Sequence, residues 1–394
     1  MKKNKKLFLK EIEEKHIIYR FFGIKFSVKN PTYIDTLKSD TKEAIKIQNA
    51  YDLSLLKNAK KLILFLVPAT VKINGGIMSI YSLCETSRKL NPDSVCIIST
   101  YPNSKYTYAK NDKFLNNEKI YRFFQIVDNC KNLDEIIIHI PEGSVKDFYS
   151  DLNPKSIKFV KSIKNVHLNI MNQNIMLMPT PKEIKNLAKI TNNITQTIAH
   201  DRYATQEVCD KWQIPTHLFS VSIDLSRYNS CSFEEKEKII VLSPDDCVYK
   251  SKIVEKLKSE LPDFNLITVQ NMTFVEYMEL ISKAYFTITF GEGFDGYFSQ
   301  PSYVNSLGLA VYNDNFFSNP KWKSFKNVYS SYENMYENIV NDINLYLNDK
   351  NLYIETIKRY RTEIDLLYKQ ENFVDNLERF YKGQYDFYPL MSNK

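Results

Sequence analysis

One acidic side chain of this 394-residue chain stands among closely spaced glycines. The whole chain has only 9 glycines, yet Glu292 lies between Gly291 and Gly293, and Asp295 and Gly296 follow shortly after. Glycine lets the backbone approach a ligand closely, and a carboxylate accepts hydrogen bonds from ligand donors. The run therefore predicts a ligand-binding loop with Glu292 at its centre.

Two strands and a helix must position this loop. Residues 286–290 form a short β-branched and aromatic run, which is typical of a buried strand. Pro301 suits the first turn of a helix. We expect that helix to end at Gly308, before a second strand over 309–312. In open α/β sheets ligands bind at the carboxyl ends of the strands, which is where Glu292 would lie.

The three glycines also match the G-x-G-x-x-G fingerprint of dinucleotide-binding proteins, and Asp314 lies near the distance expected of the ribose-binding acid. However, Glu292 and Asp295 would place two carboxylates against a pyrophosphate. The loop also comes late in the chain, with too few strands after it to complete a dinucleotide-binding half. We therefore disfavour a dinucleotide site, since a lone match carries little weight.

The same loop resembles the donor loop of GT-B glycosyltransferases. Glu292-Gly293-Phe294, with Gln300 further on, is similar to the family's Glu-Gly-Phe and Glu-x7-Glu pattern. The resemblance implies that Glu292 contacts the donor sugar, that Gly293 and Phe294 belong to the donor site, and that Gln300 holds the nucleotide ribose. Gln300 replaces the second Glu of the family, so an acceptor is kept and the charge is lost. Gly308 also comes later than the corresponding glycine usually does in the family.

A glycine pair earlier in the chain extends the resemblance. Gly75-Gly76 follows a near-continuous apolar run over 61–68, which predicts a strand of a parallel sheet, and precedes a helix that reaches Leu90. In GT-B enzymes such a turn lies against donor phosphate and acceptor. Glycines at a helix N-terminus allow backbone N–H groups to reach an anion. An ordinary turn between a strand and a helix is the alternative interpretation.

Two lysines and one histidine complete the set of residues that the resemblance implicates. Lys250 or Lys252, near the start of a helix over 252–260, stands where family members place a basic residue for the donor diphosphate. His139, near the end of a strand over 135–142, stands where they often place a polar residue on the acceptor side. A solvated lysine and a structural histidine are the alternatives.

The expected fold class is α/β, with two Rossmann-like domains facing a cleft. We divide the chain into a basic N-terminal segment, an N-terminal (acceptor) domain, a C-terminal (donor) domain, and a crossover helix with a tail, over residues 1–30, 31–215, 216–365 and 366–394. Apolar spacing from Gln370 to Tyr381 predicts a helix. It resembles the last GT-B helix, which crosses back onto the N-terminal domain.

Charge is concentrated at the N-terminus. The chain carries a net charge of +7, and residues 1–30 contain nine basic against three acidic side chains. The remainder is close to neutral, which argues against a dedicated nucleic-acid binder. The aromatic and basic N-terminal segment predicts either contact with an anionic membrane surface or a solvated tail followed by a docking strand.

The remaining composition indicates a protein of the cytoplasm. No apolar run is long enough for a membrane span, and the N-terminus lacks the apolar region of a signal peptide. The six cysteines have no paired spacing, so we expect neither a zinc site nor a disulfide framework. We expect a cytoplasmic enzyme, with peripheral attachment to the inner face of the cell membrane left open.

The function implied by the resemblance is transfer of a sugar from a nucleotide-diphosphate sugar to a hydroxyl of a glycan or lipid-linked glycan. The nucleotide sugar would be a substrate, and neither a cofactor nor a metal ion is expected. Two alternatives remain open. One is a sugar-nucleotide epimerase, and the other is a catalytically silent GT-B scaffold that binds a glycan or a partner enzyme.

Overall fold

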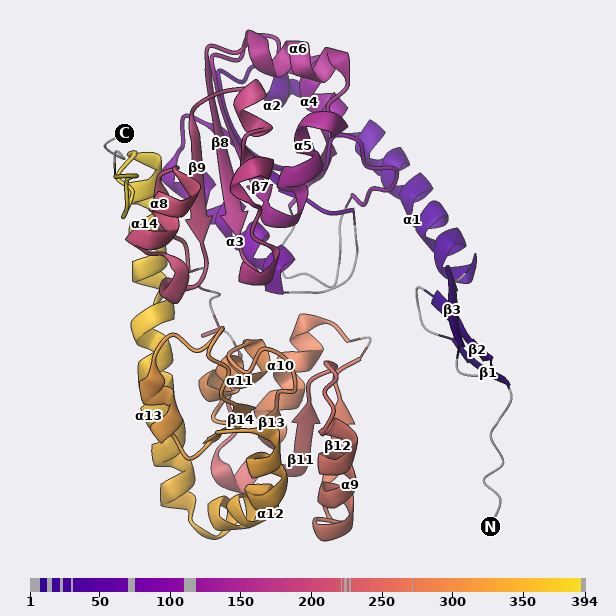
Figure 1. Ribbon diagram of the computed structural model, residues 1–394, viewed down its shortest axis with the longest axis vertical. Coiled ribbons are helices and arrows are strands. Elements are labelled where there is room, and N and C mark those ends of the chain that lie inside the picture. The colour runs from indigo at the N-terminus through magenta and orange to yellow at the C-terminus, as the bar shows by residue number, and fades with distance from the viewer. Residues whose placement is uncertain are drawn as a thin grey trace.

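The computed structural model describes the chain in two domains connected by a long helical segment (Figure 1). The described residues are 8–12, 16–21, 24–29, 31–69, 75–109, 118–220, 222, 225–226, 228–270 and 272–390.

The N-terminal domain contains a seven-stranded parallel sheet with strand order β10-β9-β8-β7-β4-β5-β6. Its strands are β4 (Lys61–Val67), β5 (Val95–Thr100), β6 (Ile120–Arg122), β7 (Glu135–Pro141), β8 (Asn165–Asn172), β9 (Ile194–Ile198) and β10 (Thr216–Leu218). The helices of this domain are α1 (Pro31–Asn49), α2 (Ser54–Lys57), α3 (Gly75–Leu90), α4 (Phe123–Asn129), α5 (Val145–Asp151), α6 (Pro154–Ser162), α7 (Pro181–Ile184) and α8 (Gln206–Trp212). The sheet extends through Leu218, past the domain boundary predicted at residue 215.

Strand β4 shows why this sheet forms. Its residues Leu62 to Val67 are all buried, and alternate positions such as Phe65 and Leu64 belong to two different hydrophobic clusters. A strand covered on both sides reads as a continuous apolar run. The strand order reverses between β4 and β7, and this is the point at which doubly wound sheets bind ligands.

The C-terminal domain contains a five-stranded parallel sheet with order β12-β11-β13-β14-β15. Its strands are β11 (Glu237–Leu242), β12 (Asn265–Thr268), β13 (Ala284–Ile288), β14 (Leu307–Val311) and β15 (Val328–Tyr329), and its helices are α9 (Lys250–Glu260), α10 (Phe274–Lys283), α11 (Gly296–Ser299), α12 (Tyr332–Asn348) and α13 (Lys350–Tyr368). The order reverses between β11 and β13, which gives this domain its own switch point.

The predicted end of the helix at Gly308 is wrong. A short 3₁₀ segment, Gln300–Val304, ends instead at Asn305, whose φ of 58° supplies the left-handed residue. Gly308 lies inside β14. A Cβ atom there would lie 2.3 Å from the carbonyl oxygen of Phe298. The glycine is therefore required by close packing of the strand against the preceding helix, and not by a helix end.

The crossover helix is confirmed. Helix α14 (Gln370–Tyr381) follows α13 and lies along the N-terminal domain, whereas α13 lies along the C-terminal domain (Figure 1). Its Phe380 is buried and stacks on His167, with ring centroids 5.6 Å apart. The hydroxyl of Tyr381 lies 2.7 Å from that of Ser87 on α3. Both domains and the crossing helix agree with the predicted α/β architecture.

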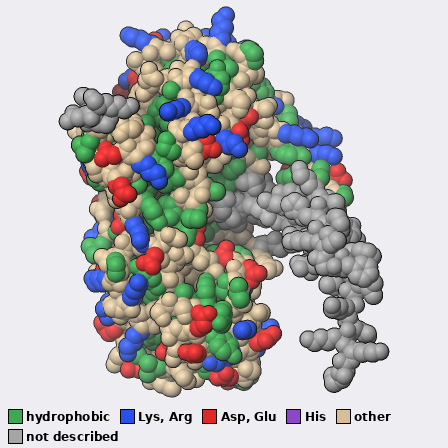
Figure 2. All heavy atoms as spheres, in the orientation of Figure 1, with side chains coloured by type: hydrophobic (Ala, Val, Ile, Leu, Met, Phe, Trp, Pro, Cys, Tyr) green, Lys and Arg blue, Asp and Glu red, His purple; other side chains and the backbone are tan. Residues whose placement is uncertain are grey.

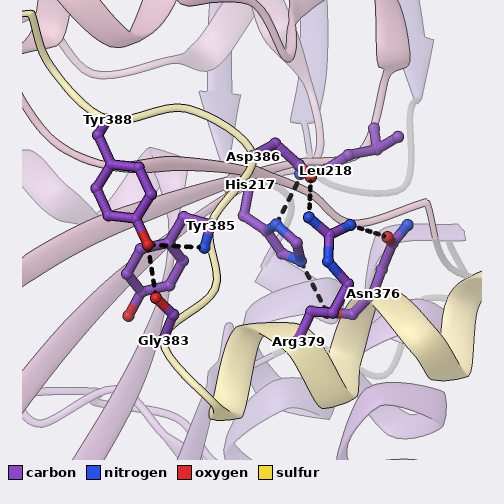
Figure 3. A network of polar contacts seen from close by, with 8 residues as sticks. All are labelled: His217, Leu218, Asn376, Arg379, Gly383, Tyr385, Asp386 and Tyr388. Carbon is purple, nitrogen blue, oxygen red and sulfur yellow. Dashed lines mark hydrogen bonds and ion pairs between the residues drawn. The ribbon is translucent and has the colours of Figure 1, made fainter.

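A partly buried network of ion pairs and hydrogen bonds fixes the segment after α14 (Figure 3). The carboxylate of Asp386 lies 2.9 Å from His217 Nδ1 and accepts a hydrogen bond of 2.7 Å from Arg379. It also accepts the backbone N–H of Leu218 at 2.8 Å. Nε2 of His217 lies 2.7 Å from the carbonyl oxygen of Asn376. The network therefore ties β10 of the N-terminal sheet to both α14 and the tail.

The remaining described elements lie before α1. Strands β1 (Phe8–Ile12), β2 (His16–Phe21) and β3 (Ile24–Lys29) form a separate antiparallel sheet. Basic and acidic side chains are interspersed over both domains on the face shown in Figure 2. Among the described helices, none combines the length and apolar character needed to cross a bilayer.

We predict that Asp386→Asn lowers the free energy of unfolding at pH 7 by about 1.5 kcal/mol, the lower end of what hydrogen bonds to a charged group contribute, because Asp386 and Arg379 are partly exposed. Burial raises the pKa of Asp386, but the hydrogen bonds from His217, Leu218 and Arg379 outweigh it and hold the pKa well below its usual range. The charged form thus contributes stability above about pH 4, and this contribution is lost as the pH falls further.

Urea denaturation at pH 7 and in acid measures this effect. The exposed Asp375 on α14, the helix that carries Arg379, supplies the control Asp375→Asn, which should match the wild type at both pH values. Equal unfolding free energies for wild type and Asp386→Asn at pH 7 would contradict the assignment.

Candidate functional site

The carboxyl ends of the two sheets meet between the domains. The Tyr203 hydroxyl, in the loop after β9, lies 3.5 Å from Asn315 Oδ1, in the loop after β14. The rings of His200 and Phe316, from the same two loops, have centroids 5.9 Å apart. Both switch points are therefore turned toward the region between the domains, where ligands of such sheets bind.

The glycine loop after β13 is held against its own sheet. Gly293 has a φ of 85°, and a Cβ atom there would lie 2.4 Å from the carbonyl oxygen of Val311. A Cβ atom on Gly291 would lie 2.9 Å from the carboxyl carbon of Asp245. Only glycine fits at position 293 without strain. Glu292 is therefore held between a close approach to the backbone of Val311 and one to the side chain of Asp245, in the loop after β11.

Two carboxylates of this loop have different environments. Burial raises the pKa of Asp295 to about 7. Asp295 accepts the N–H of Phe298 at 3.1 Å, capping α11, and makes a short hydrogen bond with the Thr289 hydroxyl. Glu292 is half-buried, and both burial and the nearby Asp245 raise its pKa. Asp295 is therefore a structural cap, whereas Glu292 accepts no hydrogen bond from the described residues and remains available to a ligand.

We predict that Asp295→Asn removes a pH dependence of stability. The raised pKa means that the folded state binds a proton more tightly than the unfolded state, so wild-type stability falls as the pH rises from about 4 to about 7. Asn keeps the acceptor for Phe298 and adds a donor for Thr289. The variant should gain on the wild type over this range, by up to about 4 kcal/mol.

Thermal unfolding from pH 4 to pH 8 checks this expectation. Asp246 is exposed in the same domain, and Asp246→Asn should follow the wild-type curve. A parallel pH dependence in the wild type and Asp295→Asn would show that the Asp295 carboxyl does not titrate as inferred.

The two predicted lysines have different surroundings. Lys250 Nζ donates a 2.9 Å hydrogen bond to the carbonyl oxygen of Ser243 and a short one to that of Asp245, and it lies over the Phe290 ring. It thus closes the β11–α9 loop beside Glu292. Lys252 is exposed and lies over the Tyr249 ring, 5.1 Å from its centroid. The structure brings Lys250 to the switch point, while Lys252 is an exposed residue in the first turn of α9.

Phe294 and Gln300 also differ in what they offer a ligand. Phe294 is 6% exposed and packs against Phe298 and Trp322 in the core. Its side chain therefore stabilises the loop, and only its backbone is left for the donor. The amide of Gln300 folds over Gly296, where a Cβ atom would lie 2.9 Å from Nε2. This places the partly buried amide at the start of α11, on the loop that carries Glu292.

On the N-terminal side, the glycine pair lies at the other switch point. Gly75 and Gly76 are the first residues of α3, and Gln173 Nε2 donates a 3.0 Å hydrogen bond to the Gly76 carbonyl oxygen. Among the residues that the structure describes, none has an atom within 4 Å of a Cβ atom on Gly75, apart from its chain neighbours and the backbone of its own helix. The start of this 16-residue helix is thus available to an anion. The preceding residues 70–74 of the predicted loop lie outside the described residues.

Glu142 is a site residue that the sequence reasoning missed. It directly follows β7, is 7% exposed, and accepts the N–H of Asn174 at 2.9 Å through Oε1. Its Oε2 is buried and has no hydrogen-bond partner among the described residues. Burial raises the pKa of the Glu142 carboxyl. In the sequence, Glu142 is only a polar residue at the end of a strand. Neither the burial of its side chain nor the lack of a partner for Oε2 can be predicted from residue type and spacing.

His139 lies near the end of its strand, as predicted, but its side chain is buried and so does not face an acceptor. His139 lies inside β7 and is 0% exposed. Its ring stacks on Phe65 with centroids 4.3 Å apart, and Asn169 donates to its Nδ1 at 3.0 Å. Burial lowers its pKa well below the usual range. Helix α14 covers it through Phe380 and Tyr381. His139 is thus part of the domain interior and not of the surface turned toward Glu292.

These residues define what the arrangement can do chemically. A half-buried carboxylate, Glu292, can accept hydrogen bonds from ligand hydroxyls. The ionised carboxylate of the buried Glu142, whose pKa is raised, can accept a proton from a ligand hydroxyl. A glycine-led helix start can bind an anionic group. The site therefore combines the groups needed to hold an anionic, hydroxyl-rich ligand between two domains.

The chain has no match among protein-family models, and no curated protein matches it in sequence. Solved structures match most of its length. A protein named TarM has a TM-score of 0.53 at 11% identity, over 81% of this chain and 98% of its own. A glycosyltransferase from Rickettsia africae has a TM-score of 0.49 at 12% identity, and the match covers 85% of this chain and 100% of that protein. A UDP-N-acetylglucosamine 2-epimerase from Rickettsia bellii has a TM-score of 0.41 at 10% sequence identity, and the match covers 82% of this chain and 99% of the epimerase.

The chain has the GT-B fold, the arrangement of two Rossmann-like domains that occurs in nucleotide-sugar glycosyltransferases and in UDP-N-acetylglucosamine 2-epimerases. The predicted family resemblance is confirmed at the level of the fold. At identities of 9–12%, the similarity goes no further than the fold.

Proposed function

We propose that this protein is a glycosyltransferase that moves a sugar from a nucleotide-diphosphate sugar to a hydroxyl of a glycan or lipid-linked glycan. The observation that carries the proposal is Glu292, a half-buried carboxylate without a hydrogen-bond donor among the described residues, fixed at the switch point of the C-terminal sheet. Across from it, the other switch point presents the start of α3 and the buried Glu142.

Each group has a role in this proposal. The diphosphate lies against the N-terminus of α3 at Gly75 and Gly76, and Lys250, at the switch point of the C-terminal sheet, supplies a positive charge. Glu292 accepts hydrogen bonds from the sugar hydroxyls, which orients the anomeric carbon, and Gln300 holds the ribose. During transfer, the bond from the anomeric carbon to the diphosphate oxygen breaks, and a bond to the acceptor oxygen forms. Glu142 receives the proton of the acceptor hydroxyl.

The proposed place of action is the cytoplasm. All six cysteines are free, and four of them, Cys84, Cys96, Cys130 and Cys209, are buried. Free buried thiols suit a reducing compartment. No cofactor or metal ion enters the proposed reaction, in which the nucleotide sugar is itself the donor substrate.

Donor identity can be tested first by binding. Thermal unfolding is followed with UDP-, GDP-, CMP- and TDP-sugars, since a ligand that binds only the folded state raises stability by RT ln(1 + [L]/Kd). Nucleotide release with candidate acceptors then separates the possibilities. Release that depends on the acceptor supports transfer, whereas isomerisation of the sugar without acceptor would indicate the epimerase. Binding without any turnover would indicate the silent scaffold.

We predict that Glu292→Ala lowers kcat/KM by about 10²-fold or more, because contacts that strengthen in the transition state are lost. The melting temperature should remain nearly unchanged, since no described residue donates to the Glu292 carboxylate. Glu279→Ala, on the exposed side of α10 in the same domain, is the control and should retain full activity. Wild-type turnover in Glu292→Ala would remove Glu292 from the site.

We also predict that Glu142→Gln lowers kcat by about 10²–10⁴-fold, the usual contribution of a positioned base. Wild-type activity should rise with pH as the Glu142 carboxyl, whose pKa is raised, loses its proton. This rising limb should be absent from the residual activity of the variant, while donor binding persists. An unchanged pH profile in Glu142→Gln would show that another group receives the proton.

A further inference from the structure

A cavity of about 300 Å³ lies at the amino ends of the strands of the N-terminal sheet. On one side it is lined where β7 begins at Glu135, where β8 begins at Asn165, and at Asn193, which leads into β9. The facing wall is the end of α14 and the tail after it, with Phe380, Tyr381, Lys382, Gly383 and Tyr385. The 7 residues of β7, at about 3.3 Å per residue, set Glu135 about 23 Å from Glu142. The cavity is therefore separate from the candidate site between the domains.

A buried chain of hydrogen bonds fixes the tautomer of His167, which lines the cavity. The Thr195 hydroxyl donates to Asn169 Oδ1 at 2.9 Å, so in its 2.8 Å contact with His167 Nε2 it must accept. Burial lowers the pKa of His167 to about 4, so the ring is neutral at pH 7. With its proton on Nε2, the ring has a lone pair on Nδ1. No described residue bonds to Nδ1, and this atom is not enclosed by the protein, so the cavity gives a ligand access to a hydrogen-bond acceptor.

The charged side chains of the cavity wall already have partners. Glu135 Oε2 lies 3.8 Å from Lys61 Nζ, and Lys382 Nζ lies 2.6 Å from Glu378 Oε1. Since Glu135 and Lys382 are the charged residues of the lining, the wall has no net charge. A phosphate or a nucleotide would find no unpaired cation among these residues. The electrostatics of the cavity therefore favour a neutral ligand.

Aromatic rings and amide groups form much of the remaining wall. The rings of Phe380 and Tyr385 have centroids 5.7 Å apart, and Figure 3 shows Tyr385 on the tail next to Tyr388, at 5.8 Å. Asn165 and Asn193 are exposed, and each amide offers donors and an acceptor. A ligand that suits this wall has an apolar face for the rings and hydroxyls for the amides and for Nδ1. A sugar ring has both.

We propose that this cavity binds a neutral saccharide unit. One hydroxyl of the sugar donates to His167 Nδ1, another bonds to the amide of Asn193, and the C–H face of the sugar lies against the aromatic wall. The volume is at the lower end of small-ligand sites, which suits a single sugar unit. The identity of the ligand rests on the proposed function: the unit belongs to a long glycan acceptor whose reacting hydroxyl lies at Glu142, at least about 23 Å away.

NMR of the full chain with isotopically labelled histidine tests the binding, because the chain has only five histidines. His167→Gln identifies the His167 ring resonances. Maltohexaose, cellohexaose and chitohexaose are the probes, each added up to about 10 mM, which covers Kd values in the millimolar range. At least one probe should shift the His167 resonances in a saturable way, and inorganic phosphate should leave them unchanged.

A pair of neighbouring asparagines supplies the variant and its control. Asn193→Ala should weaken saccharide binding by about fivefold, the usual effect of losing one hydrogen bond. Asn192 is also exposed but does not line the cavity, so Asn192→Ala should bind as the wild type does. Three results would overturn the proposal: no shift with any of the saccharides, a shift with phosphate alone, or equal weakening by the two variants.

Steady-state kinetics test whether the acceptor reaches the cavity. Asn193→Ala should raise KM for a long glycan acceptor by about fivefold, while kcat and the KM for an acceptor too short to reach the cavity stay unchanged. An unchanged KM for the long acceptor, in an enzyme that transfers sugar, would overturn the link to the acceptor and leave the proposed function intact. Absence of transfer to any acceptor would instead contradict the proposed function, and the histidine titration would still decide whether the cavity binds a saccharide.

Discussion

The arrangement of the two domains depends on the helical segment that spans both of them. Helix α13 packs with the C-terminal domain and α14 with the N-terminal domain, where Phe380 enters the interior and Asp386 closes an ion-pair network with His217. A parallel sheet presents its ligand site only at its carboxyl ends. Two such edges face each other here because one continuous stretch of chain is anchored to both sheets.

Much of this architecture was visible in the sequence. The continuous apolar run over residues 61–68 predicted a strand of a parallel sheet, and β4 is that strand, buried from Leu62 to Val67. The helix end at Gly308 was misplaced because a glycine required by packing against Phe298 looks the same in sequence as a glycine that ends a helix. The spacing of residues along the chain predicts helices and strands well. It does not show which atoms from other elements pack against a given residue.

The candidate site shows the same division. Sequence spacing located the loop of Glu292, yet it gave no means of assigning different roles to Glu292 and Asp295, which differ only in their partners. His139 drew attention as a polar residue near a strand end, whereas the register places it under α14. Glu142 was not singled out from the sequence. It became a candidate because its buried Oε2 has no hydrogen-bond partner among the described residues. Burial and pairing, which arise only on folding, decide all three assignments.

The anchoring of α14 has a consequence for recombining this protein with its structural relatives. A buried relay of polar groups runs from His167 through Thr195 and Asn169 to His139, and Tyr381 of α14 lies 3.4 Å from the far nitrogen of that histidine. The last helix is thus matched to the first domain although it follows the second in the chain. A chimera that exchanges the donor half must therefore be cut twice, so that residues 370–390 stay with their original acceptor half.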